Sequence, residues 1–420
     1  MRKQTRRSFI KAAVLTAGMM AARNSLVAQN QFTLNGIAHP YPDEWLPNGV
    51  RSSFIDNING LRFHILEAGY QSAGRPAVLL LHGFPELAYS WRNIMPSLAN
   101  AGYHVIAPDL RGYGRTTGYN SDYHADLSPF RMLNKVRDCV GLVYVLGYKS
   151  VAAVIGHDFG SPLAAWCAVT RADIFKAVTM MSAPFGGTGS IPFDTMNNPA
   201  QGVATKGPSI YDDLAALKPP RKHYQRYYET EEANQNMWRA KQGLSNFIRA
   251  YYHHKSADWD GNRPHRLKAR SAEEWAKMPT YYIMELDKGM AETVDTHMPN
   301  PSIVNTNTWL TERDLSVYNE EFSRTGFQGG LNSYRMGSSG IGKAELQLYA
   351  GKTIDQPSMF ISGASDWGTY QNPGSFERMQ EYACTDMRAV HLIEGAGHWV
   401  QQEQADMTSE LILEFLKDLS

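Results

Sequence analysis

Short apolar runs alternate with helix-period segments through the first half of the 420-residue chain. The runs lie at residues 77–81, 104–107, 151–155 and 177–181. A run without polar alternation is typical of a strand that is buried on both faces. Between these runs, apolar residues recur at helical spacing over 132–146 and 163–170. The alternation predicts an α/β fold with a mostly parallel, doubly wound sheet that helices cover on both faces.

The alternation stops after residue 184 and resumes near the end of the chain. The segment between is rich in Tyr, Trp and charged residues, and its periodicity is helical, as over 211–217, 224–246 and 312–325. Apolar runs at 359–361 and 390–393 then predict two more strands before a closing helix over 410–419. The expected division is a helical cap at 185–340, inserted late into one core made of 29–184 and 341–420.

The first 28 residues have the pattern of an export signal. Arg6 and Arg7 precede a mild apolar run over 12–22, which resembles a signal peptide of the twin-arginine type. Such a short run cannot span a hydrocarbon core, which takes roughly 20 residues in helical form. We expect residues 1–28 to address the folded protein to the bacterial periplasm through the twin-arginine export machinery, without a stable membrane span. The alternative is a basic helix that stays on the mature protein.

The balance of charged residues argues against a nucleic-acid partner. The chain has 41 Lys and Arg against 41 Asp and Glu, and a nucleic-acid partner would require a basic excess for phosphate contacts. Cys139, Cys167 and Cys384 are scattered and form no C-x-x-C pair, which excludes a disulfide framework or a cysteine zinc site. With no phosphate-binding glycine loop either, we expect no nucleic acid, no metal and no cofactor.

The most informative motif follows the apolar run at 151–155. A predicted strand leads into a small-x-Asp-x-small pattern over 156–160 and then into a helix. This is the pattern of a nucleophile elbow, with Asp158 where esterases carry serine. The small residues are needed because bulk in this tight turn would collide with neighbouring backbone. Such a turn presents its side chain at the carboxyl edge of the sheet, where ligands of α/β folds bind. The alternative is that Asp158 is an ordinary helix N-cap.

Three further motifs follow predicted strands. Phe84 lies in the turn after the first apolar run, where its backbone N–H and that of Phe159 would form an oxyanion hole. Asp366 and His398 each follow one of the late strands. The order of nucleophile, acid and histidine along the chain is the one that the α/β-hydrolase architecture predicts.

With these motifs, the chain resembles the epoxide hydrolase branch of the α/β-hydrolase superfamily over nearly its whole length after the signal. The resemblance implies that Asp158 is the nucleophile, that His398 is the general base and that Asp366 orients His398. It also implies that the backbone N–H groups of Phe84 and Phe159 stabilise an oxyanion.

Two features of the predicted cap add to the resemblance. Residues 331–335, Leu-Asn-Ser-Tyr-Arg, are similar to a cap motif of the family, which implies that Tyr334 binds the epoxide. The resemblance implies a second epoxide-binding tyrosine in the segment 280–282. Counting back from the Gly-Met-Ala-Glu stretch at 289–292 favours Tyr281 over Tyr282.

The implied reaction opens a small, largely apolar epoxide with water to a vicinal diol. An aspartate with a pKa of about 3.9 is already ionised at neutral pH and needs no base to activate it. Its attack forms an ester of Asp158, and two cap phenols would give the departing oxygen a proton. A water activated by His398 would then hydrolyse the ester, since an ester, unlike an ether, has a carbonyl that water can attack.

Two other functions fit parts of the pattern. A hydrolytic dehalogenase would use the same triad, but it holds the halide with side-chain N–H donors, which Phe84 and Phe159 lack. A non-catalytic ligand binder on the same fold would be expected to have lost a triad member, and Asp158, Asp366 and His398 are all present. Ser161 lies outside the central position of the elbow and is therefore not expected to be a serine-esterase nucleophile.

Overall fold

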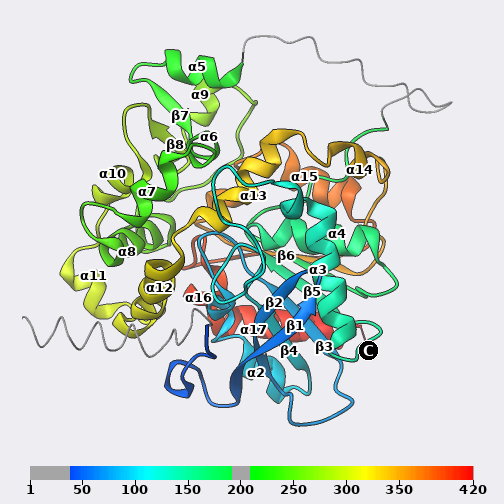
Figure 1. Cartoon of the computed structure of the whole chain (residues 1–420). Helices are drawn as coiled ribbons and strands as arrows, with labels where there is room; N and C mark the ends of the chain where they lie inside the picture. Colours follow the sequence, from blue (N-terminus) through cyan, green and yellow to red (C-terminus); the bar gives the residue numbers. More distant parts are fainter. Residues whose placement is uncertain (1–37, 192–208, 420) are drawn as a thin grey trace, which may run out of the picture. The chain divides into compact units, whose positions relative to one another are not determined.

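The computed structural model describes residues 38–191 and 209–419, so the predicted signal peptide lies outside the described residues. The described residues from Pro42 onward form one compact unit, and an eight-stranded sheet runs through it (Figure 1). The strands, in sheet order, are β1 (Val50–Ile58), β2 (Leu61–Ala68), β4 (His104–Pro108), β3 (Ala77–Leu81), β5 (Ala153–His157), β6 (Val178–Met181), β9 (Ser358–Gly363) and β10 (Met387–Ile393).

The sheet is mostly parallel. From β4 to β10 all neighbouring strands pair in parallel, whereas β2 is antiparallel to both β1 and β4. The central strands β3, β4, β5, β6 and β9 are buried along their whole length, which is why they are continuous apolar runs rather than alternating ones. The predicted α/β fold class is confirmed.

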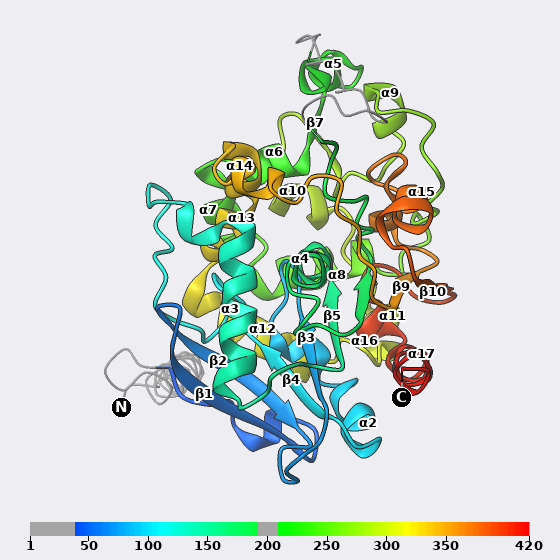
Figure 2. The ribbon, with the colours of Figure 1, turned by 90° about the vertical axis from the view of Figure 1, so that its right-hand side faces the viewer.

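Helices cover both faces of the sheet (Figure 2). On one face α3 (Met132–Val145) packs beside α4 (Gly160–Thr170), and on the other α2 (Met95–Asn100) packs beside α17 (Ala405–Lys417). Helix α4 contacts both β5 and β6 and is apolar almost all round, as a helix enclosed in a core must be. Shorter helical turns are η2 (Asp43–Trp45), η3 (Ala88–Trp91), η4 (Ser128–Phe130), η5 (Trp367–Thr369), α15 (Ser375–Arg378), η6 (Met379–Ala383) and α16 (Val400–Glu403).

A mainly helical segment lies between β6 and β9. Its elements are α5 (Ile210–Ala216), β7 (Arg221–His223), α6 (Tyr224–Tyr228), α7 (Glu232–Trp238), α8 (Leu244–Lys255), α9 (Ala272–Trp275), β8 (Ile283–Glu285), α10 (Met290–Asp295), α11 (Pro301–Thr306), α12 (Glu312–Thr325), α13 (Gln328–Ser339) and α14 (Lys343–Gln347). We call α5 to α13 the insert. The antiparallel ribbon of β7 and β8 was not predicted, and the helical pattern over 224–246 is divided among α6, α7 and the start of α8.

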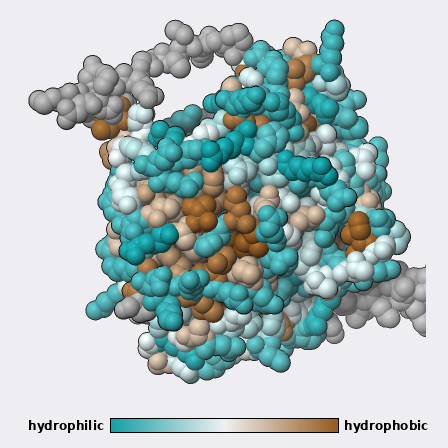
Figure 3. Space-filling model, turned by 180° about the vertical axis from the view of Figure 1, so that it is seen from behind, coloured by the Kyte–Doolittle hydropathy of each residue, from teal (hydrophilic) through white to brown (hydrophobic). Residues whose placement is uncertain are grey.

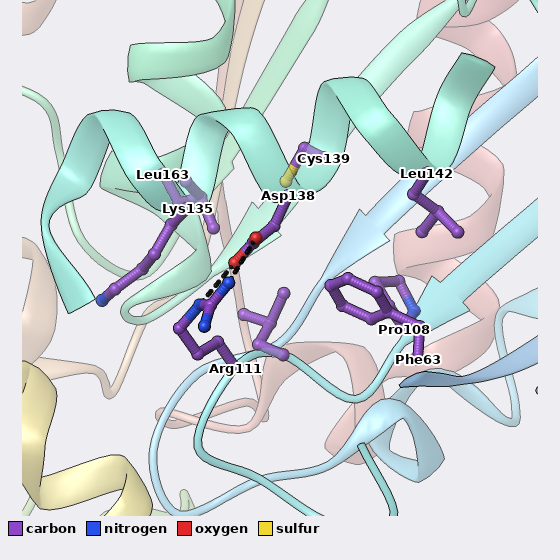
Figure 4. A pocket seen from close by; sticks show the side chains of 9 residues that line it. Phe63, Pro108, Arg111, Lys135, Asp138, Cys139, Leu142 and Leu163 are labelled. Carbon is purple, nitrogen blue, oxygen red and sulfur yellow. Dashed lines mark hydrogen bonds and ion pairs between the residues drawn. The ribbon is translucent and has the colours of Figure 1, made fainter. Parts of the chain in front are cut away.

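A buried ion pair joins three parts of the core below α3. Arg111 donates from Nε and Nη2 to the carboxylate of Asp138, at 2.8 and 2.7 Å, and Asn59 in the β1–β2 turn donates to the same carboxylate at 2.6 Å. Figure 4 shows the pair beside a small cavity of about 10 Å³, with Lys135 extending away from it. The hairpin turn, the loop after β4 and α3 are thereby fixed to one another.

The surface is largely hydrophilic. Seen from behind, hydrophobic residues gather near the centre of this face, with smaller groups toward its margins (Figure 3). Among the residues that the structure describes, no helix has both the length and the apolar character needed to cross a bilayer.

Candidate active site

The predicted site residues converge at one edge of the sheet. Phe84, Asp158 and Asp366 follow the carboxyl ends of β3, β5 and β9, and His398 follows β10. These strands are parallel, so their carboxyl ends meet at the same edge, the usual ligand-binding edge of α/β sheets. The insert reaches this edge, where its Tyr334 ring packs edge-on to those of Phe159 and Phe84, with centroids 4.5 and 5.3 Å apart.

The turn between β5 and α4 is a strained elbow. Asp158 has φ +51°, a left-handed conformation that is unfavourable for residues with a Cβ atom. Two glycines allow the chain to close so tightly. A Cβ on Gly156 would lie 1.9 Å from the carbonyl oxygen of Gly160, and a Cβ on Gly160 would lie 2.1 Å from that of Leu81. Asp158 is therefore at the tip of the turn, as the sequence pattern predicts.

The Asp158 carboxylate is held from two sides. The backbone N–H of Phe84 donates to its Oδ1 atom at 2.9 Å, and Nε2 of His398 lies 3.5 Å from Oδ2. Burial raises the pKa of Asp158, but the His398 imidazole and the positive charge of Lys255 outweigh burial and hold this pKa below its ordinary value of 3.8. The carboxylate is therefore ionised at neutral pH. A hydrogen-bonding role for the Phe159 N–H stays a prediction.

His398 is oriented by two groups behind it. Its Nδ1 atom lies 3.1 Å from Oδ1 of Asp366 and 3.0 Å from the hydroxyl of Ser182. Burial raises the pKa of Asp366, but His398, Ser182 and the Gly368 N–H lower it below 3.8. Because an ionised Asp366 can only accept a hydrogen bond, the Nδ1 atom of His398 carries the proton. Nε2 is then left with its lone pair and, within the described chain, without a hydrogen-bond partner.

A second histidine lies beneath the elbow. The Nδ1 atom of His157 donates to Glu86 at 2.6 Å, and its Nε2 atom donates to the backbone carbonyl of His398 at 2.7 Å. Both partners accept, so the imidazole carries two protons and forms a buried ion pair with Glu86. Glu86 also accepts from the Gly83 N–H and from the amides of Gln401 and Gln402. The pair links the nucleophile turn to the backbone of the candidate base.

The loop that bears His398 is also fastened to the insert. The Glu403 carboxylate accepts from the backbone N–H groups of Gly397 and Trp399, at 2.8 and 2.9 Å, and from that of Ala257 just after α8, at 2.8 Å. Burial raises the pKa of Glu403 to about 8, although the three N–H donors act in the opposite direction. The three hydrogen bonds hold the two loops in one register.

Two tyrosines of the insert face each other above Asp158. The rings of Tyr334 (α13) and Tyr224 (the first residue of α6) have centroids 6.0 Å apart and are nearly perpendicular. For both phenols burial raises the pKa well above 10, and the negative charge of Asp158 raises it further. Both are therefore neutral O–H donors next to the nucleophile. The Tyr224 hydroxyl also lies 3.4 Å from Oε1 of Gln371.

Tyr281 is placed differently from this pair. Its hydroxyl donates to Oδ1 of Asn262 at 2.6 Å, and its ring packs against His254 and Tyr282. The placement favours Tyr224 over the predicted Tyr281 as the partner of Tyr334. The ring of Tyr282 packs against that of Tyr224, with centroids 5.1 Å apart, whereas the ring of Tyr224 itself contacts that of Tyr334.

Sequence analysis missed several residues of the site, and only one of them has a local sequence signal that could have indicated it. Ser182 directly follows the apolar run at 177–181, so the rule that polar groups follow strands would have indicated it. Glu403, Tyr224 and Lys255 had no such signal, because their contacts join segments far apart in the chain.

A pocket of about 390 Å³ opens beside the tyrosines. Phe159 and Tyr334 form part of its wall, together with Gln225 and the ion pair of Arg226 with Glu229, which is 2.7 Å long. Two of its lining residues, Phe159 and Tyr334, therefore belong to the candidate site. In the residues that the structure describes, no group of three or more His, Cys, Asp or Glu side chains could hold a metal ion.

Replacing Glu86 by Gln is expected to lower the free energy of unfolding by about 3–5 kcal/mol, because it leaves the buried His157 charge uncompensated. Burial lowers the pKa of His157, but Glu86 raises it above 6.5, so this stabilisation is complete below pH 6.5 and is lost as pH rises through the raised value. The pKa of Glu86 is raised by burial but brought below 4.5 by His157, so its share is complete above pH 4.5 and is lost as pH falls.

Urea unfolding across a pH series measures this difference, which should be largest between pH 4.5 and 6.5. The matched control is Asp173→Asn, which breaks the exposed pair with Arg171 and should cost no more than about 1 kcal/mol. A difference between wild type and Glu86→Gln that stays constant into alkaline pH would contradict a charged His157.

Comparison with known proteins places this geometry in a family. The model of the alpha/beta hydrolase fold family matches residues 76–405. Epoxide hydrolase B of Mycobacterium tuberculosis is 32% identical over 365 residues, which cover 87% of this chain and 98% of that protein. Epoxide hydrolase A of the same organism is 32% identical over 373 residues, which cover 88% and 99%.

Solved structures agree with these matches. An epoxide hydrolase from an endophytic Streptomyces is 30% identical with a TM-score of 0.69, covering 89% of this chain and 97% of that one. Epoxide hydrolase A from Mycobacterium thermoresistibile is 28% identical with a TM-score of 0.65, covering 90% and 98%. The chain therefore belongs to the α/β-hydrolase fold family, and the four similar proteins named above are epoxide hydrolases.

Proposed function

We propose that the protein is an epoxide hydrolase that opens an epoxide to a vicinal diol through an ester of Asp158. The observation that carries the proposal is the arrangement around one carboxylate. Nε2 of His398, which has no hydrogen-bond partner among the described residues, lies 3.5 Å from Oδ2 of Asp158. The ring of Tyr334 packs against that of Phe159, the next residue in the chain, and against that of Tyr224. The similarity to epoxide hydrolases over most of the chain supports the same reaction.

The first step is displacement at an epoxide carbon. Oδ1 of Asp158 is occupied by the Phe84 N–H, which leaves Oδ2 to attack. A bond forms between Oδ2 and the carbon while the bond from that carbon to the ring oxygen breaks. The ring oxygen takes a proton from one of the Tyr224 and Tyr334 hydroxyls, which leaves a phenolate held by the other. A placed acid of this kind contributes roughly 10²–10⁴ in rate.

The second step is hydrolysis of the ester. Nε2 of His398 takes a proton from water, and the hydroxide adds to the carbonyl carbon of Asp158. The Phe84 N–H, with that of Phe159, stabilises the oxyanion, and Asp366 stabilises the imidazolium. Collapse breaks the bond to the diol oxygen, which takes the proton from His398. The proton on the restored carboxyl group returns to the phenolate, so every group regains its starting state.

The assignment of the second phenol to Tyr224 replaces the predicted Tyr281. The departing oxygen must lie within reach of both phenols at once, and the Tyr224 and Tyr334 rings are in contact. The hydroxyl of Tyr281 is held by Asn262. The site offers less support for a dehalogenase. Such an enzyme holds the halide with side-chain N–H donors, and neither the Phe84 nor the Phe159 side chain can donate a hydrogen bond.

Replacing His398 by Gln should trap the ester. Displacement needs no base, whereas hydrolysis does, so we expect the variant to accumulate the full substrate mass on the peptide that contains Asp158. Intact and peptide mass spectrometry after incubation with terminal and styrenyl epoxides measures the adduct, and Asp158→Asn is the control that should show none. Absence of an adduct with every epoxide, together with halide release from haloalkanes, would instead favour the dehalogenase.

Tyr224→Phe and Tyr334→Phe should each slow the displacement step about 10- to 100-fold, because each removes one hydrogen bond to a developing alkoxide. Tyr281→Phe is the matched control and should remain close to wild type. Single-turnover fluorescence of the tryptophans measures the step without interference from hydrolysis. A larger loss in Tyr281→Phe than in Tyr224→Phe would return the role to Tyr281.

We also propose that residues 1–28 are a twin-arginine signal and that the insert is part of a cap over 185–340 within a core of 29–184 and 341–420. The paired arginines support export in the folded state to the periplasm. Changing both Arg6 and Arg7 to Lys should keep the precursor in the cytoplasm of a bacterium that has this machinery, as cell fractionation would measure. Normal export of the variant would refute this route.

A further inference from the structure

The hydroxyl of Tyr224 lies between the side-chain amides of two glutamines. Nε2 of Gln225 donates to it at 3.2 Å, and Oε1 of Gln371 lies 3.4 Å from it. Because Nε2 of Gln371 donates to the backbone carbonyl of Gly368, its oxygen is the atom that faces Tyr224. A phenol has one proton to donate, and with that proton on Gln371 the phenol oxygen accepts from Gln225.

The start of α6 holds this arrangement in place. Nδ1 of His223 accepts from the backbone N–H of Gln225 at 3.3 Å, and the backbone N–H of Tyr224 donates to the carbonyl of Tyr282 at 2.8 Å. Burial, with the charges of two arginines, lowers the pKa of His223 to about 3. Its ring is therefore neutral at neutral pH and can accept a hydrogen bond. The backbone that bears Tyr224 and Gln225 is thereby fixed from two sides.

The two phenols of the site differ in what acts on their anions. Burial and the charge of Asp158 raise the pKa of Tyr224, whereas the side chains of Gln225 and Tyr334 lower it, since a donor at the oxygen stabilises a phenolate more than a phenol. For Tyr334, burial and the charges of Tyr224 and Asp158 all raise the pKa. A phenolate at Tyr224 therefore keeps Tyr334 protonated.

The Gln225 amide belongs to the pocket beside the tyrosines. Gln225 lines this cavity of about 390 Å³ together with Phe159 and Tyr334. An epoxide oxygen that accepts from the Tyr224 hydroxyl replaces the Gln371 oxygen in that role. The Gln225 N–H need not move, because it already donates to the phenol oxygen.

We propose that Tyr224 is the phenol that gives its proton to the epoxide oxygen, and that Gln225 is the positioning residue that selects it by donating to the phenolate left behind. This inference rests on the proposed function and decides between its two phenols. Oδ2 of Asp158 bonds to the epoxide carbon as the bond from that carbon to the ring oxygen breaks. The ring oxygen takes the Tyr224 proton, and the electron pair of the O–H bond stays on the phenol oxygen. Tyr334 donates a hydrogen bond and keeps its proton.

Removal of the amide donor should slow the displacement step. Gln225→Met keeps the length of the side chain without an N–H group, and we expect ester formation to slow about 10- to 100-fold, because a hydrogen bond to an anion is lost. Gln225→Lys returns N–H donors and should restore part of the rate. Adduct formation on Asp158 in a His398→Gln background, quenched at intervals and followed by mass spectrometry, measures displacement without hydrolysis.

Gln242→Met is the matched control, because it makes the same substitution elsewhere in the insert. Nε2 of Gln242 donates to the carbonyl of Ala291 at 2.8 Å, so one amide hydrogen bond is lost away from the phenols and displacement should keep its rate. In a Tyr224→Phe background, Gln225→Met should cause little further loss, since no phenolate forms at 224. A further loss of similar size there would show that Gln225 acts on the pocket rather than through Tyr224, and would overturn the proposal.

Fluorinated tyrosines placed at 224 or at 334 identify the proton donor without any change at Gln225. Fluorine lowers the pKa of a phenol with little change in its size, and a stronger acid transfers its proton faster. We expect displacement to quicken with fluorination at 224 and to respond less at 334. The reverse order would assign the proton to Tyr334 and overturn the proposal, whether or not the Gln225 variants fold.

These outcomes separate the inference from the proposed function. If the adduct forms equally fast with and without Gln225→Met, the role of Gln225 is refuted and the epoxide hydrolase stands. If no epoxide gives an adduct in the His398→Gln background, the proposed function fails, and the assignment of the proton donor fails with it.

Discussion

The site depends on one backbone conformation, the left-handed turn at Asp158. A residue with a Cβ atom pays about 1–3 kcal/mol to stay there, and it stays because β5 and α4 are buried on both sides of it. Because Gly156 and Gly160 have no Cβ atom, the backbone at each of these positions can lie in direct contact with neighbouring backbone. The same approach brings Oδ1 of Asp158 to the Phe84 N–H. Rigid elements thus aim the carboxylate before any substrate arrives.

Buried charges around this turn are balanced in pairs. Glu86 is matched by His157, and the proton on Nδ1 of His398 points at Asp366. Burial raises the pKa of each of these carboxyl groups and so favours its neutral form. The histidine partner lowers the same pKa, so the carboxylate stays ionised at neutral pH. Burial lowers the pKa of Lys255, and the nearby carboxylates of Asp158, Asp366 and Glu86 act in the opposite direction.

The sequence was sufficient for the fold class and for the meeting of Asp158, Asp366 and His398 at one edge of the sheet. Each of these residues lies a few residues after an apolar run, and the carboxyl ends of parallel strands meet at a common edge whatever the details of side-chain packing. The insert offered no such rule. Its tyrosines are too numerous for spacing to distinguish them, and the facing of Tyr224 with Tyr334 arises from α6 and α13, which are about a hundred residues apart in the chain. Long-range contacts of this kind leave no local pattern, so Tyr281 was preferred on spacing alone.

The hydrogen bonds between the insert and the loop that bears His398 limit how ligands can bind and leave. Glu403 joins the end of α8 to the backbone on both sides of His398, and the indole of Trp399 donates to the carbonyl of Tyr252 while the Tyr252 hydroxyl donates to that of Pro85. Swinging the insert away as a lid would break these buried bonds together and would displace the base. Ligand exchange that leaves these bonds intact requires rotations of side chains, which occur on a far shorter timescale than the hinging of a domain.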